Sequence, residues 1–300
     1  MRKSGVILVV VVTTCFALLA ACAPAPVPTT TTTTTTTVAP VDCTARGPGV
    51  DLHGCDLSNT DLQSANLSFA DLTDADLTSA DLTGANLFQA NLSNADLSNA
   101  DLSNADLSSV DLSGARVFNV NLSGATLTDV NLTGAIVSDV DMSGARLKSA
   151  DLSGARLTGS NLTNVNLSGA DLSGTDLSGS TVVLSDLHNA NLSGANLRNS
   201  VLGNVNLSGA DLSAADLRDA TLRISDFFGA NLAGARLNRA VLVGINLTSS
   251  TLTDADLTDA NLTDVDLTAA GRVGAIWTGA SCGFGSEPSV FCVDFLATAP

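Results

Sequence analysis

The chain has 300 residues and a formal net charge of −17, and only 3% of its residues are aromatic, with no tyrosine. A globular core of this size normally uses more large rings, so the composition disfavours one. The excess of carboxylates argues against direct binding to nucleic acid or to anionic lipid, while it permits solubility and association with cations.

The N-terminal residues have the pattern of a secretion signal. Two basic residues precede an apolar run over residues 6–19, which is short for a membrane-spanning helix. A Leu-Ala-Ala-Cys sequence ending at Cys22 follows and resembles the lipobox of bacterial lipoproteins, whose cysteine becomes the mature N-terminus and carries the lipid. We therefore expect residues 1–21 to be a signal peptide and Cys22 to anchor the protein to a membrane. A plain signal peptide cut next to Cys22 is the alternative.

Residues 22–41 follow the signal and are rich in Ala, Pro, Val and Thr, with an unbroken threonine run over 29–37. Such a segment cannot bury apolar area, so we expect a disordered tether. Loss of residues 1–21 would remove two basic residues and no acidic ones, taking the net charge from −17 to −19.

A leucine-like residue then recurs every five positions from Leu52 to Leu267 without a slip in register. This period is neither the 3.6 residues of an α-helix nor the 2 residues of a strand. A second small residue stands two positions earlier, which gives the unit Ala-(Asp/Asn)-Leu-(Ser/Thr)-x, as in residues 95–99. A fixed short repeat predicts a solenoid.

This unit resembles the pentapeptide-repeat family over residues 50–270. The resemblance implies an all-β fold, a right-handed quadrilateral parallel β-helix of about 11 coils, spanning residues 42–272. It also implies that the leucine and the small residue point inward and the other three positions point outward. Glycines recur at the fifth position every 20 residues, where we expect one corner of the coil; they are Gly114, Gly134, Gly154, Gly174 and Gly194.

Four cysteines remain beyond Cys22. The two ends of a straight solenoid lie tens of ångströms apart, whereas a disulfide needs Cα atoms within about 7 Å. We therefore expect pairs Cys43–Cys55 and Cys282–Cys292, one at each end; free or metal-binding thiols are the alternative. Residues 273–300 carry apolar side chains and are interpreted as a cap over the last coil, with a dimerisation surface as the alternative.

Catalytic chemistry has little support in the sequence. The two histidines, His53 and His188, lie on outward positions many coils apart, no Ser-His-Asp set is available, and no glycine-rich phosphate loop follows a strand. We expect no enzymatic activity, no cofactor and no metal.

The outward positions form columns of residues 20 apart. One column, from Asp51 to Asn231, mixes Asp and Asn, which favours a solvated ladder over weak cation binding or phosphate mimicry. Another, from Asp56 to Asp256, alternates Asp and Arg in blocks, as local charge compensation would. Arg198 and Arg218 stack in adjacent coils as a modest basic strip. One side of four coils is unusually apolar. It is either a contact surface or a place where the repeat pattern has drifted toward β-branched residues that suit strands. Its outward residues are Val183, Leu184, Val201, Ile224, Val241 and Val243.

These features predict a non-enzymatic cell-envelope lipoprotein whose solenoid is a structural or protein-interaction scaffold. Its expected partners are the membrane, through Cys22, and a protein or a second copy, with no direct nucleic-acid binding. The resemblance also implies an alternative, an acidic DNA mimic that binds DNA gyrase as quinolone-protecting relatives do. The secretion signal disfavours that alternative, because gyrase is cytoplasmic.

Overall fold

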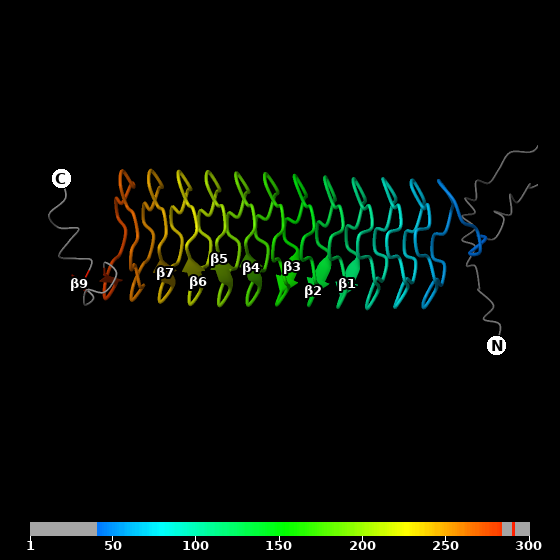
Figure 1. Cartoon of the computed structure of the whole chain (residues 1–300), viewed down its shortest axis with the longest axis horizontal. Helices are drawn as coiled ribbons and strands as arrows, with labels where there is room; N and C mark the ends of the chain where they lie inside the picture. Colours follow the sequence, from blue (N-terminus) through cyan, green and yellow to red (C-terminus); the bar gives the residue numbers. More distant parts are fainter. Residues whose placement is uncertain (1–40, 284–289, 292–300) are drawn as a thin grey trace, which may run out of the picture. The chain divides into compact units, whose positions relative to one another are not determined.

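A computed structural model of the chain describes residues 41–283 and 290–291. These residues form parallel coils stacked along one axis (Figure 1). None of them belongs to a helix that is long and apolar enough to span a bilayer. The signal peptide, Cys22, the tether and Cys292 lie outside the described residues.

The coil length is 20 residues. β-Bridges join residues 20 apart in parallel register, and one unbroken column runs from Asp51 to Gly271 in eleven such steps. Backbone hydrogen bonds close each step; for example, the N–H of Leu52 donates to the carbonyl of Asp71 at 2.7 Å, and the N–H of Asp71 to the carbonyl of Val50 at 2.9 Å. The predicted all-β parallel solenoid is confirmed.

The core is a ladder of the two inward residues of each unit. The central residues from Leu52 to Leu262 and nearly all the small residues before them are buried. Hydroxyl groups replace alanine at several inward positions and bond to the backbone, as when Ser200 Oγ donates to the carbonyl of Leu197 at 2.6 Å. The core therefore accepts Ser without an unpaired polar group at that position.

The corners share one backbone conformation. Every fifth residue from Gly54 to Gly279 has a positive φ, and most of those that are not glycine are Asn, Asp or Ser. The predicted glycine corner exists, since Gly114 has φ of 68°, but it is one of four equivalent corners. The preceding Asp or Asn fixes the turn, because its Oδ1 accepts the N–H two residues on; Asp151 accepts from Ser153 at 3.0 Å.

Extended strands appear where this acceptor is missing. In β1 to β7 the first residue is Arg, Ile, Thr or Val instead of Asp or Asn, so no carboxylate or amide oxygen holds the turn. The replacement is required but not sufficient, since Thr126 and Arg146 start no strand. The strands are β1 Arg116–Phe118, β2 Ile136–Ser138, β3 Arg156–Thr158, β4 Thr181–Val183, β5 Val201–Gly203, β6 Thr221–Arg223 and β7 Val241–Val243.

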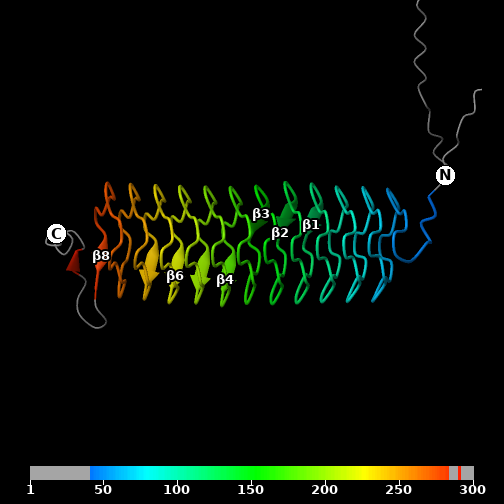
Figure 2. The ribbon, with the colours of Figure 1, turned by 90° about the horizontal axis from the view of Figure 1, so that it is seen from above.

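These strands make two parallel sheets on different sides of the coil. Strands β1, β2 and β3 form one, and β4, β5, β6 and β7 form the other, in chain order (Figure 2). Each pair is joined at a 20-residue interval, as in the pairing of Val201 with Thr181 below and Thr221 above. Side chains that start neighbouring strands therefore lie one above another.

Both ends of the stack are fastened. The expected disulfide between Cys43 and Cys55 is present, with Cα atoms 5.5 Å apart. At the other end β8 (Ser281–Cys282) pairs antiparallel with β9 (Val290–Phe291), which covers the strand edge of the last coil. Cys282 is disulfide-bonded, and its expected partner Cys292 lies outside the described residues.

Candidate interaction surface

The six apolar outward residues predicted from the sequence lie together on the sheet of β4 to β7, and we call them the apolar strip. Leu184, Val201 and Ile224 are 59%, 44% and 68% exposed, and the other three are half-buried. Valine and threonine alternate along the first column of this sheet, from Thr181 to Val241. The sheet presents an apolar surface four strands high.

The apolar strip also lacks negative charge. Residues 181–184, 201–204, 221–224 and 241–244 contain no carboxylate and a single cation, Arg223. Earlier coils of the same side carry an aspartate at the first outward position, namely Asp61, Asp81, Asp101 and Asp141. On a chain with a net charge of −17, the four strands themselves present no carboxylate to an approaching molecule, and Asp226 lies at their edge beside Ile224.

Two residues of the strip occupy an unfavourable backbone conformation. Leu184 and Ile224 stand at corners with φ of 58° and 52°, in a region that large and β-branched side chains avoid. Their neighbours in the column are Asn164, Asn204 and Gly244, which suit it better. Such strain in an exposed apolar residue has no role in the core and is common at functional sites.

A shallow hollow lies between the corners at Asn204 and Ile224. It has a volume of about 360 Å³ and includes Asn204, Ile224 and Asp226 in its lining. The surface therefore alternates along the corner column, with a protruding side chain at Leu184, a depression at Asn204 and a second protrusion at Ile224.

The sheet of β1 to β3 carries exposed apolar groups that the sequence reasoning missed. Phe118 and Ile136 are exposed, and Ile136 borders a hollow of about 400 Å³. Thr158 Oγ1 in the same hollow is buried without a hydrogen-bond partner, because Arg156 stands where the usual Asp or Asn acceptor would be. The loss of Asp or Asn at Arg116, Ile136 and Arg156 is visible in the sequence and could have revealed this sheet.

The Asp and Asn columns are ladders of hydrogen bonds. In eight places an Asn side-chain amide donates to the Asp one coil closer to the N-terminus, at 2.8–3.1 Å. These amides belong to Asn121, Asn131, Asn161, Asn191, Asn196, Asn206, Asn231 and Asn246. Interleaving thus turns repulsion between stacked carboxylates into attraction.

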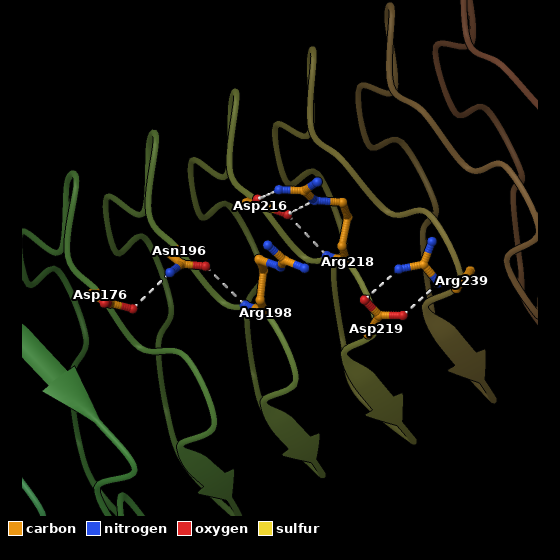
Figure 3. Close-up of polar contacts among 7 residues, drawn as sticks. All are labelled: Asp176, Asn196, Arg198, Asp216, Arg218, Asp219 and Arg239. Carbon is orange, nitrogen blue, oxygen red and sulfur yellow. Dashed lines mark hydrogen bonds and ion pairs between the residues drawn. The ribbon is translucent and has the colours of Figure 1, made fainter.

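Arg218 of the basic strip and the nearby Arg239 are each paired with an aspartate (Figure 3). Arg218 makes a two-point contact with Asp216, and Arg239 binds Asp219 through two hydrogen bonds of 2.7 Å. These guanidinium groups lower the pKa of both carboxyls. Arg198 Nε, by contrast, is buried without a hydrogen-bond partner.

The histidines do not assemble a reactive site. His53 Nδ1 lies 2.7 Å from Asp51 Oδ1, and this hydrogen bond raises the pKa of the imidazole. His188 Nδ1 lies 2.9 Å from the backbone and hydroxyl oxygens of Ser208 in the next coil. His188 is several coils away from His53. Within residues 41–283 and 290–291, no group of three or more His, Cys, Asp or Glu is placed to hold a metal ion.

The model of the family described as "Pentapeptide repeats (8 copies)" matches most of the chain. The matched residues are 49–84, 85–124, 106–144, 141–179, 185–223 and 225–268. The chain belongs to the pentapeptide-repeat family. No curated protein matches it.

Solved structures of other pentapeptide-repeat proteins are similar to the chain. HetL, involved in heterocyst differentiation regulation in the cyanobacterium Nostoc, is 32% identical over 78% of this chain and 89% of its own, with a TM-score of 0.35. A thylakoid-lumen protein of Arabidopsis thaliana is 35% identical over 33% of this chain and 67% of its own, with a TM-score of 0.31.

A more distant similarity is to trypsin-treated QnrB1, a plasmid-mediated fluoroquinolone resistance protein. It is 18% identical, over 67% of this chain and 94% of its own, with a TM-score of 0.34.

Proposed function

We propose that this pentapeptide-repeat protein is a non-enzymatic scaffold of the cell envelope and that the apolar strip is its protein-contact surface. The carrying observation is the coincidence, on β4 to β7, of exposed apolar side chains, absence of carboxylates and strained corners at Leu184 and Ile224. Exposed apolar side chains occur elsewhere too, as at Phe69 and Phe118, but on the strip they coincide with the other two features over four adjacent strands. Together the three features favour a contact surface over chance loss of the repeat pattern.

The envelope location is supported by the chain's N-terminus and its cysteines. A charged start, a short apolar run and Cys22 follow one another in the order of a lipoprotein signal. A disulfide between Cys43 and Cys55 suits an oxidising compartment outside the cytoplasm.

The strength of the contact is modest. Full burial of a Val, Leu or Ile contributes about 1.5–3 kcal/mol, and Leu184, Val201 and Ile224 still expose roughly half of their surface. Covering all three therefore supplies on the order of 3–4 kcal/mol before the costs of association. Such a surface suits a partner held nearby on the same membrane, where the effective concentration is high.

The test is cross-linking in intact cells with the full chain. We expect Val201→Lys with Val241→Lys to remove specific cross-linked species, because two cations then occupy the strip. The matched control is Phe118→Lys with Ile136→Lys, which places two cations on exposed apolar positions of the other sheet. Unchanged cross-links in the first variant would refute the contact surface.

Location is tested separately. We expect Cys22 to incorporate a radiolabelled fatty acid and the Cys22→Ser chain to lose both the label and the membrane fraction. An unlabelled, cytosolic parent chain would refute the envelope part of the proposal.

A further inference from the structure

The corner column of the apolar strip alternates between large and small residues. From Leu184 it continues to Asn204, Ile224 and Gly244, each one coil beyond the last. With about 4.8 Å between neighbouring strands, the two large side chains stand about 10 Å apart. A hollow beside Asn204 is lined by Ile224 and Asp226 and does not reach Leu184.

This order is complementary to itself. Consider a twofold axis parallel to the strands and midway between β5 and β6, relating two copies that face each other with antiparallel rods. The axis places Leu184 of one copy opposite Gly244 of the other, and Ile224 opposite Asn204. Each protruding corner thus meets a small or polar one, in both directions.

The remaining columns obey the same symmetry. Along the third outward position the side chains are Val183, Gly203, Arg223 and Val243, so the axis places the long Arg223 opposite Gly203. A Cβ at Gly203 would make ordinary van der Waals contact with Val183 at 3.8 Å, so there is room above Gly203 for a group that packs beside Val183. The twofold axis that pairs the corners therefore also pairs the long side chain of Arg223 with Gly203, which has none.

Register favours a second copy over an unrelated partner, and charge selects the strip among the sides that two copies could use. Two copies have the same rise per coil, so protrusions and hollows that match at one coil also match at the next. The chain's net charge of −17 opposes association of two copies on most sides, and the strip has no carboxylate over its four strands. Repulsion between carboxylates is therefore smallest when two strips approach, and the one like-charge contact in the interface is between the two Arg223 side chains near the axis.

We infer that the apolar strip binds the same strip of a second copy, in an antiparallel twofold dimer centred between β5 and β6. This inference rests on the proposed contact surface and names its occupant. The strip covers roughly 20 Å by 10 Å, well below the ~800 Å² per partner of a standard interface. We therefore expect a weak dimer, populated at high local concentration.

The first experiment measures mass by light scattering of the full chain in non-ionic detergent, over a wide range of concentration. Leu184→Asn with Ile224→Asn should raise the dissociation constant about tenfold or more, while the monomer stays folded because Asn suits these corners. The control is Phe69→Asn, which changes another exposed, positive-φ apolar corner on a different side and should leave dimerisation unchanged.

The second experiment tests the symmetry with disulfides. A mixture of Leu184→Cys and Gly244→Cys chains should form a mixed disulfide, because these positions face each other. Each variant alone should not, because its own copies lie three coils apart, about 14 Å, beyond the reach of a disulfide. The parent chain controls for pairing through the natural cysteines.

The outcomes separate the two proposals. A chain that stays monomeric at all concentrations, or a Leu184→Cys chain that cross-links to itself, overturns the twofold dimer. If cellular cross-links to another protein are still lost in the Val201→Lys, Val241→Lys chain, the contact surface stands and only its occupant was wrong. If neither dimerisation nor cross-linking responds to strip substitutions, both proposals fail.

Discussion

Ile224→Asn should make the solenoid more stable, although it removes an apolar residue. Ile224 has φ of 52°, a conformation that costs an L-residue roughly 1–2 kcal/mol and a β-branched one at least as much. Only about a third of the side chain is covered, so its packing returns about 0.5–1 kcal/mol. Asn adopts the same corner conformation at Asn204 in the coil below. The net expectation is a gain of about 0.5–1 kcal/mol.

The assay is thermal unfolding followed by far-ultraviolet circular dichroism. For a domain of this size, 1 kcal/mol corresponds to about 2–4 °C in Tm, so we expect a rise of about 1–4 °C. The opposite change in the parent chain, Asn204→Ile, adds the same strain at a neighbouring corner and should lower Tm by a similar amount. A Tm that falls in Ile224→Asn would show that the corner is not strained, and the functional argument from strain would lose its basis.

Other predictions concern the ends and the core. The pKa of His53 should lie above its usual value because of the hydrogen bond to Asp51, and Asp51→Asn should lower it in an NMR titration. The stability that this pair contributes is full below the usual pKa of histidine while Asp51 is ionised, and it is lost as pH rises through the raised pKa of His53. Replacing Cys43 and Cys55 by Ser should speed amide exchange in the first coils only, because coils support their neighbours; uniform loss of protection would contradict this. Leu152→Ala should cost about 2–5 kcal/mol in denaturant unfolding because the side chain is fully buried, whereas Leu152→Met should cost less than about 1.5 kcal/mol.

Inward and outward positions could be predicted from the sequence because a single periodicity governs both. Leu67 and its equivalents are the only consistently large apolar residues, so they had to be inside, and they are. The apolar strip was found for the same reason, since Val201 and Ile224 break an otherwise polar pattern at outward positions. The N-terminal disulfide followed from the distance between the ends of a rod.

The local backbone was harder to predict. Glycine suggested one special corner, whereas Asn99, Asp129 and Ser149 adopt the same positive φ without it. The missing information is a hydrogen bond: an Asp or Asn oxygen holds most of the turns, and strands β1 to β7 form only where that oxygen is lost. That bond depends on three-dimensional geometry, so the strands, the hollow at Asn204 and the unpartnered Thr158 Oγ1 could not be located from periodicity alone.

The coil has 20 residues in four five-residue units. The distance of a surface feature along the solenoid axis and the side on which it lies can therefore vary separately. Adding a whole coil between the Cys43–Cys55 clip and β4 would move the apolar strip about 4.8 Å farther from that end while leaving its compass direction unchanged. Adding a single unit would instead swing everything beyond it by a quarter turn. The number of complete four-unit coils before β4 therefore sets the distance of the strip from the disulfide. Any units left over from complete coils set the side of the solenoid on which the strip lies.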